Sequence, residues 1–206
     1  MPSFISPKDG FNGKRIASEC YPGNTLTYTL CKESPTRKSA LMTEYVKVAL
    51  MGSGYAGKST LIKLLTDKIQ KFECNYQPTA GMNCGTLTID ENTKVSLIEM
   101  GGQAHFEFLW PDFMRGSQMV VVVTESNPKA VLKTRQILEK YKTELEGVKV
   151  IAIANKQDIP GSMRPESVQD LLGVPTFGMV AIDPKERVNG YKLIVGGIRD
   201  MVQIAS

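Results

Sequence analysis

Gly52-Ser53-Gly54-Tyr55-Ala56-Gly57-Lys58-Ser59 is the stretch that decides how this chain folds. It fits the pattern of a glycine, four residues, a second glycine, a lysine and a serine or threonine that is typical of a phosphate-binding P-loop. The β-branched apolar run 46–50 precedes it with the length of a strand, and Leu61, Leu64 and Leu65 follow it at helical spacing. The stretch is therefore predicted to connect a strand to a helix, which is the context that the motif requires.

The residue types in this loop suit an anion. Glycines leave no Cβ to obstruct a phosphate, so successive backbone N–H groups can point at it, and the start of the following helix adds its positive dipole end. Lys58 would reach the β- and γ-phosphates of a nucleotide, and the Ser59 hydroxyl would ligate Mg²⁺. The other residues expected to contact the nucleotide here are Gly52, Ser53, Gly54, Tyr55, Ala56, Gly57 and Thr60. The alternative is a glycine-rich turn without a ligand, which the flanking strand and helix disfavour.

Composition and charge bound the class of protein. With 206 residues, 42% hydrophobic and 22% charged, the chain has the size and composition of one well-buried globular domain with a small appendage. The formal net charge is +4, and residues 1–43, with six basic and three acidic side chains, carry +3 of it. The remainder is nearly neutral, which argues against a nucleic-acid-binding face on the main domain.

The cysteines and the apolar runs indicate the cellular compartment of the protein. The four cysteines form no CxxC pair, and one histidine cannot complete a zinc site of usual spacing, so we expect free thiols in a reducing, cytoplasmic setting. No apolar run has transmembrane length, and the first residues lack the layout of a signal peptide. Pro2 stands where N-myristoylation needs glycine. We therefore expect at most peripheral association with a membrane.

The first 43 residues differ from the rest. Stretches 14–21 and 25–32 flank the turn signal Pro22-Gly23-Asn24, which predicts a β-hairpin, and the polar segment 32–39 reads as a linker. We therefore expect an N-terminal extension over 1–43 and the main domain over 44–206. The extension either packs on the domain and modulates it or is a flexible tail of little consequence.

Beyond the P-loop, strands and helices alternate. A loop is expected over 73–84, and a polar turn joins two strands into an antiparallel hairpin. The order then expected is strand 85–89, strand 94–100, strand 119–123, helix 128–145, strand 148–154, helix 165–172, strand 177–182 and helix 191–202. Pro128 suits a first helical position behind the capping Asn127, and Gly173 suits a helix end. Alternating strands and helices predict an α/β fold with a parallel sheet.

A second motif indicates which base is bound. Asn155-Lys156-Gln157-Asp158 follows an apolar strand, at the end where open α/β sheets bind ligands. The Asp158 carboxylate can accept from both N1–H and N2–H₂ of guanine, whereas adenine offers no such donor pair. Leaving a buried carboxylate there unpaired would cost several kcal/mol, so adenine should be rejected. Lys156 would lie along the base, and Asn155 would tie this loop to the P-loop.

Together the motifs resemble those of the Ras-like small GTPases, and most closely the ADP-ribosylation-factor (Arf) family. The resemblance spans residues 45–203. The segments that carry it, besides the P-loop, are Pro78-Thr79-Ala80-Gly81-Met82-Asn83, Gly101-Gly102-Gln103, Leu109-Trp110, Asn155-Lys156-Gln157-Asp158-Ile159-Pro160 and Leu171-Leu172-Gly173. It implies a Ras-like fold with a mostly parallel six-stranded sheet, one antiparallel hairpin and helices on both faces.

The resemblance also assigns roles near the phosphates. Thr79 would give Mg²⁺ a hydroxyl, Gly102 would give the γ-phosphate a backbone N–H, and Gln103 would orient the attacking water. Glu99 stands where the family has an aspartate and would hold Mg²⁺ through water, one methylene further from its backbone. His105 is a second candidate for positioning water, with an exposed loop histidine as the alternative.

Further roles concern the base and the partners. Ala181-Ile182-Asp183 is loosely similar to the family's third base-contacting loop, in which Ala181 and Ile182 would contact the nucleotide. Met82, Ile98 and Phe113 fall where the family exposes apolar residues to effectors, with core packing as the alternative. The hairpin 85–100 would be the interswitch, which slides by register between nucleotide states in Arf proteins.

The sequence thus predicts a GTP/GDP-controlled switch that hydrolyses GTP slowly with Mg²⁺, through Gln103 and Lys58. No arginine occupies the motifs, so a GTPase-activating protein is expected to supply one, alongside a nucleotide exchange factor and effectors. Two alternatives stay open: a GTP-dependent binding module that does not hydrolyse, and a P-loop ATPase or kinase, which Asp158 disfavours.

Overall fold

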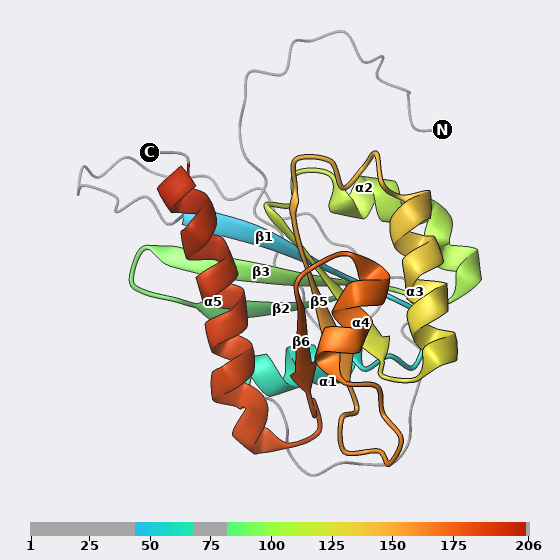
Figure 1. The fold of residues 1–206 in the computed structure, drawn as a ribbon. Coiled ribbons are helices and arrows are strands. Elements are labelled where there is room, and N and C mark those ends of the chain that lie inside the picture. The colour runs from blue at the N-terminus through green and yellow to red at the C-terminus, as the bar shows by residue number, and fades with distance from the viewer. Residues whose placement is uncertain (1–43, 68–81, 205–206) are drawn as a thin grey trace, which may run out of the picture. The chain divides into compact units, whose positions relative to one another are not determined.

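A computed structural model describes residues 44–67 and 82–204 of the chain (Figure 1). The strands are β1 (Glu44–Met51), β2 (Met82–Thr88), β3 (Thr93–Met100), β4 (Met119–Glu125), β5 (Lys149–Asn155) and β6 (Thr176–Met179). The helices are α1 (Lys58–Leu65), α2 (Trp110–Met114), α3 (Pro128–Lys140), α4 (Pro165–Leu172) and α5 (Arg187–Ile204), with the short 3-10 helices η1 (Ala104–Leu109) and η2 (Pro184–Glu186). The hairpin predicted within residues 1–43, and Thr79, lie outside the described residues.

The six strands form one sheet in the order β2-β3-β1-β4-β5-β6. β2 pairs with β3 in antiparallel fashion, and every other neighbouring pair is parallel. The predicted α/β fold, with one antiparallel hairpin in a mostly parallel sheet, is confirmed. Parallel pairing places the carboxyl ends of β1, β3, β4 and β5 along one edge, where ligands of open α/β sheets bind.

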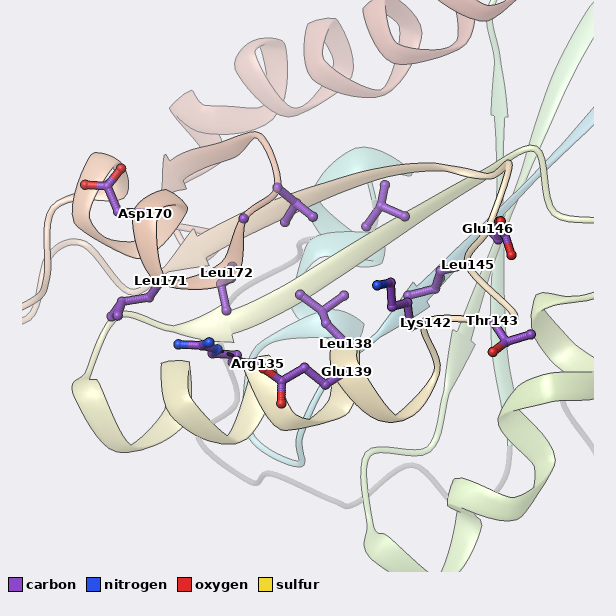
Figure 2. A pocket seen from close by; sticks show the side chains of 13 residues that line it. Arg135, Leu138, Glu139, Lys142, Thr143, Leu145, Glu146, Asp170, Leu171 and Leu172 are labelled. Atoms are coloured by element: carbon purple, nitrogen blue, oxygen red, sulfur yellow. Dashed lines mark hydrogen bonds and ion pairs between the residues drawn. The ribbon is translucent and has the colours of Figure 1, made fainter.

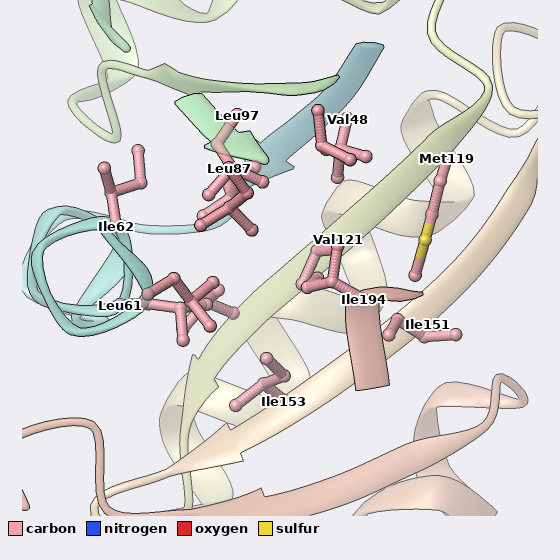
Figure 3. Close-up of a cluster of buried hydrophobic side chains, with 14 of the residues drawn as sticks. Val48, Leu61, Ile62, Leu87, Leu97, Met119, Val121, Ile151, Ile153 and Ile194 are labelled. Carbon is pink, nitrogen blue, oxygen red and sulfur yellow. The ribbon is translucent and has the colours of Figure 1, made fainter. Parts of the chain in front are cut away.

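Helices cover both faces of the sheet, because strand residues alternate between two buried clusters (Figure 1). Val48 and Leu50 of β1 face α1 and α5, where Leu61 and Ile194 also lie (Figure 3). On the opposite face, the buried residues of α2, α3 and α4 pack against Ala49 and its neighbours. Each face therefore carries a core that fixes the strands, and with them the loops at the carboxyl edge.

Several helix boundaries follow the local signals in the sequence. The Asn127 side chain accepts from the Ala130 N–H at 2.9 Å and caps α3, and Gly173 ends α4 in the left-handed region with φ 69°. The prediction was wrong for the end of α3: the helix stops at Lys140, and turns follow as far as Gly147, whose φ is +74°. A positive φ there favours glycine, and the helical pattern over 141–145 did not reveal it.

Two further differences concern the segments beside the P-loop. β2 begins at Met82, inside the stretch expected to be a loop, because its residues pair with β3 as far as Met82 opposite Met100. η1 and α2 occupy a segment for which no element was predicted. Short helices of five or six residues give too few turns for a periodic signal.

Candidate functional site

The loop between β1 and α1 adopts a shape that requires glycine at two positions. Gly52 has φ +141°, and a Cβ on it would lie 2.1 Å from the Val123 carbonyl oxygen. Gly57 has φ +101°, and a Cβ on it would lie 2.2 Å from Nδ2 of Asn155. Both contacts are far shorter than any side chain tolerates, so the loop is held tightly between β4 and the Asn155 loop.

Lys58 opens α1 and folds back over the loop. Its side chain is only 4% exposed, and its Nζ donates to the carbonyl oxygens of Gly52 and Ser53, both at 2.9 Å. Burial lowers the pKa of the Lys58 amine from 10.5 to about 8, and the negative charge of Glu99 partly opposes this shift. Among the described residues, the hydrogen-bond acceptors of this ammonium are carbonyl oxygens, and a buried ammonium so placed would gain from an anion.

One polar atom of the loop indicates a ligand. Within the described residues, the Ser53 hydroxyl oxygen is buried and has no hydrogen-bond partner. Buried polar groups almost always find a partner, and an exception calls for an unrepresented ion, ligand or water. The loop residues therefore fit a phosphate group, whose oxygens would accept from this hydroxyl.

Ser59 and Glu99 meet beneath the loop. The Ser59 hydroxyl donates to Oε1 of Glu99 at 2.7 Å, and the Asn83 amide of β2 donates to Oε2 at 3.0 Å. Asn83 lies directly opposite Glu99 in the hairpin register, and the Glu99 side chain is 2% exposed. Each oxygen of the Glu99 carboxylate therefore accepts a hydrogen bond from a neighbouring side chain.

A hydroxyl and a carboxylate are the oxygen donors that Mg²⁺ prefers. Over residues 44–67 and 82–204, no group of three or more His, Cys, Asp or Glu side chains could hold a metal ion. Ser59 and Glu99 would thus fit Mg²⁺ only together with nucleotide oxygens, as is usual for this metal. The third expected ligand, Thr79, is outside the described part of the chain.

Asn155, at the end of β5, joins three loops. Its Nδ2 donates to the Ala56 carbonyl oxygen at 2.9 Å, and its Oδ1 accepts from the Ala181 N–H at 2.9 Å. The predicted tie between this loop and the P-loop is therefore present, and the loop after β6 joins the same residue. Ile182, the next residue in that loop, is exposed.

The neighbours of Asn155 include residues that sequence reasoning missed. Gln157 donates from Nε2 to the Ser126 hydroxyl at 2.6 Å, and that hydroxyl donates to the Asn155 carbonyl oxygen at 2.7 Å. Lys156 forms an ion pair with Glu125, the residue opposite Asn155 in the sheet. The only signal in the sequence was that Glu125 and Ser126 end a strand next to the Asn155 strand.

The Asp158 carboxylate is exposed, which corrects the expectation that it is buried. It lies in the turn after β5, where no element of the described chain covers it. A base stacked between the loops would supply that cover and make an unpaired carboxylate costly. Discrimination by Asp158 would therefore arise when the base is bound.

The segment after β3 closes over the P-loop. The Gly54 N–H donates to the Gly102 carbonyl oxygen at 2.8 Å, and a Cβ on Gly102 would lie 2.5 Å from Lys58 Nζ. Gln103 follows directly and is the N-cap residue before η1. Gly102 thus lies against the phosphate loop as expected, but its carbonyl oxygen accepts a hydrogen bond from an N–H of that loop. The role of Gln103 stays a prediction.

The three residues expected to face effectors differ in exposure. Met82 is 47% exposed, whereas Ile98 and Phe113 are half-buried, and Phe113 packs against the core on the α3 side. Cys84 lies opposite Ile98, which places Met82 and Ile98 on one face of the hairpin. Phe108 of η1, which the sequence reasoning passed over, is 74% exposed.

A groove of about 660 Å³ lies elsewhere, between the C-terminal ends of α3 and α4 (Figure 2). Its apolar lining includes Leu138 and Leu172, and its rim carries Lys142 and Asp170. None of its lining residues belongs to the P-loop or to the loops joined by Asn155, so the groove is separate from the site described above.

The fold and the site together define a P-loop GTPase of the Ras-like class. The chain belongs to the ADP-ribosylation factor family, whose sequence model matches residues 33–192. It is similar to ADP-ribosylation factor-like protein 10 of Mus musculus, with 32% identity over 132 residues that cover 64% of this chain and 53% of the mouse protein. The chain therefore spans about half the length of that relative and is a divergent, Arf-like member of the family.

None of the helices in the described ranges is both long and apolar enough to cross a membrane.

Proposed function

We propose that this protein is a GTP/GDP-controlled molecular switch that depends on Mg²⁺ and hydrolyses GTP slowly. The observation that carries the proposal is the pair of hydrogen bonds made by Asn155, to Ala56 and to Ala181. A glycine-rich turn without a ligand would not need its position fixed against two distant loops. A nucleotide requires this arrangement, because its phosphates and its base must be bound at a set distance from each other.

The phosphates would be bound by the P-loop. The Ser53 hydroxyl would gain a partner, and Lys58 would exchange carbonyl contacts for a phosphate. Charge-assisted hydrogen bonds are about twice as strong as neutral ones, so this exchange favours binding. Ser59 and Glu99, with Thr79, would hold Mg²⁺, which when bound neutralises negative charge that develops on the phosphate oxygens.

Hydrolysis would depend on Gln103, which would orient the attacking water. Without an arginine in the motifs, the rate would stay slow until a GTPase-activating protein supplied one. An exchange factor would speed nucleotide release, and effectors would dock on Met82, Ile98 and Phe113. The exposure of Met82 supports this surface, to which Phe108 is a candidate addition.

One observation favours a second candidate function. Both oxygens of Glu99 are engaged by Ser59 and Asn83, so a metal-bound water would have to share them. If that competition weakens the metal site, the protein would bind GTP and recruit a partner without hydrolysing it. Single-turnover GTP hydrolysis with and without Mg²⁺ separates the two functions.

Nucleotide competition tests the proposal. GDP and GTP should displace a fluorescent guanine nucleotide, and ATP should not. Asp158→Asn should weaken GTP and favour xanthosine triphosphate, because the new amide can pair with the added oxygen of xanthine. Asp170→Asn, on the rim of the separate groove, is the matched control and should change neither affinity. Equal affinity of the unmodified protein for ATP and GTP would contradict the proposal.

Three expectations stay predictions. They are the cytoplasmic setting, the division at residue 44 and the modulating role of residues 1–43.

A further inference from the structure

The C-terminal end of α3 holds η1 through Glu107. The Tyr141 hydroxyl donates to the Glu107 carbonyl oxygen at 2.9 Å, and Lys140 Nζ donates to Oε2 of Glu107 at 2.8 Å. The Lys140 ammonium also lies 5.1 Å from the centre of the Tyr141 ring. The last residue of α3 and the C-cap residue that follows it thus bind both the side chain and the backbone of one residue in η1.

Trp110 connects Tyr141 to the segment that contacts the P-loop. Its ring is fully buried, and its centroid lies 5.4 Å from that of Tyr141. Its Nε1 donates to the Gly101 carbonyl oxygen at 3.1 Å. A continuous set of contacts therefore runs from Tyr141 through Trp110 to Gly101, which immediately precedes Gly102.

The Gly102 carbonyl oxygen in turn accepts a hydrogen bond from the Gly54 N–H. The backbone N–H groups of a P-loop are the groups that cradle nucleotide phosphates, and its lysine reaches the γ-phosphate. Gly102 packs against both, since a Cβ on it would lie 2.6 Å from the Gly54 nitrogen and 2.5 Å from Lys58 Nζ. A terminal phosphate would therefore have to displace Gly102 from this position.

We propose that Lys140 and Tyr141 form a latch at the C-terminal end of α3 that keeps Gly101 and Gly102 against the P-loop and so disfavours GTP relative to GDP. The proposal rests on the proposed function and adds to it a regulatory contact outside the nucleotide motifs. Gly101 cannot withdraw while Trp110 holds its carbonyl oxygen, and Trp110 is itself packed on Tyr141 beside the bonded Glu107. Lys140 and Tyr141 are positioning residues, because they act through Glu107 and Trp110.

The test compares GTP and GDP affinity in variants of the full chain. Tyr141→Phe removes the hydroxyl and keeps the ring against Trp110, so the affinity for a non-hydrolysable GTP analogue should rise about 2- to 10-fold relative to GDP, the range for one net hydrogen bond. Lys140→Ala should act in the same direction and less strongly, because its side chain is 56% exposed. Combining Lys140→Glu with Glu107→Lys should restore the ratio of the unmodified protein.

The matched control lies on the same helix. Arg135 forms an ion pair with Glu139 at 2.9 Å, within α3, so Arg135→Ala should leave the GTP-to-GDP ratio unchanged. Trp110 is the chain's one tryptophan, and its fluorescence gives a second readout. With GDP bound, Tyr141→Phe should shift the emission towards that of the GTP-analogue form.

The outcomes separate the latch from the proposed function. In one outcome, Tyr141→Phe and Lys140→Ala lower the melting temperature and yet give the same ratio of GTP to GDP affinity as Arg135→Ala. In that case the two residues only stabilise the fold, and the latch is wrong. If the unmodified protein binds neither GDP nor the GTP analogue, the proposed function fails, and the latch fails with it.

Discussion

The two ends of the site are built differently. On the base side, Asn155 joins the loop after β5 to the P-loop and to the Ala181 loop through groups that a nucleotide need not displace. On the side proposed for the terminal phosphate, the Gly54 N–H donates to the Gly102 carbonyl oxygen, a hydrogen bond that a bound phosphate would have to replace. The hydrogen bonds that fix the loops on the base side are therefore already made, whereas a terminal phosphate would have to rearrange its own end of the site. Choice of base would be fixed, and the number of phosphates would be what the molecule senses.

The largest effect is expected in the P-loop, which both ends of the site share. Gly52→Ala would place a Cβ 2.1 Å from the Val123 carbonyl oxygen, which belongs to the backbone of a central strand and cannot move aside. We expect the free energy of unfolding in urea to fall by roughly 3 to 5 kcal/mol.

The matched control for Gly52→Ala is Gly147→Ala. Gly147 also has positive φ, +74°, but nothing lies within 4 Å of its Cβ position. Gly147→Ala should lower the free energy of unfolding only by the strain of a left-handed backbone, about 1 to 2 kcal/mol. Equal losses for the two variants would show that the close approach of the P-loop to β4 is unimportant.

The second prediction removes the tie on the base side. Asn155→Ala leaves the Ala56 carbonyl and the Ala181 N–H without their partner, so we expect a loss of roughly 2 to 4 kcal/mol in nucleotide affinity, for GDP and GTP alike. Isothermal titration measures both affinities. Gln169→Ala is the control, because it removes one hydrogen bond to Thr176 away from the nucleotide loops and should spare binding. If only the affinity for GTP fell, Asn155 would act on the terminal phosphate, and the proposed difference between the two ends of the site would be wrong.

The third prediction concerns the terminal phosphate alone. Gln103→Leu should slow single-turnover GTP hydrolysis by roughly 10- to 1,000-fold, as is typical for removing one positioning group, and leave GDP affinity nearly intact. An unchanged hydrolysis rate would shift the role to another group in η1, of which His105 is the first to test.

The smallest effect is expected at Glu99, a proposed Mg²⁺ ligand. Glu99→Asp shortens the side chain by one methylene and pulls it from Ser59 or from Asn83. We expect the free energy of unfolding to fall by about 1 kcal/mol and Mg²⁺ to bind a few-fold more weakly. Tighter Mg²⁺ binding would mean that the native glutamate fits the metal poorly, which would favour the function without hydrolysis.

Much of the fold was predictable because its signals are local. The P-loop glycines, the alternating strands and the cap Asn127 each act within a few residues, and the family's motifs fixed their order. The interval from Ala104 to Met114 gave no periodic signal, and α3 was predicted too long because the helical pattern continues through residues 141–145, which form turns. The P-loop residues, Asn155 and Gly102 were correctly expected to converge.

The remaining parts of the site could not be read from the sequence because they depend on distant contacts. The bond between Asn83 and Glu99 needs the register of the hairpin, and the attachment of Glu107 to Lys140 and Tyr141 needs α3 to stop where it does. Asp158 was expected to be buried because base contact was assumed, and the structure shows it exposed. Such pairs are set by packing between elements and leave no spacing pattern along the chain.

A titration of the nucleotide-free protein with GDP, GTP and ATP in the presence of Mg²⁺ probes the base side and the phosphate side together. A formed base side predicts that ATP binds at least about 100-fold more weakly than GTP, as expected when a site built for one set of donors meets a ligand that lacks them. A closed phosphate side predicts that GDP binds more tightly than GTP, by roughly 10-fold for the loss of the Gly54 bond. ATP binding as tightly as GDP, or GTP binding more tightly than GDP in the unmodified protein, would contradict the account.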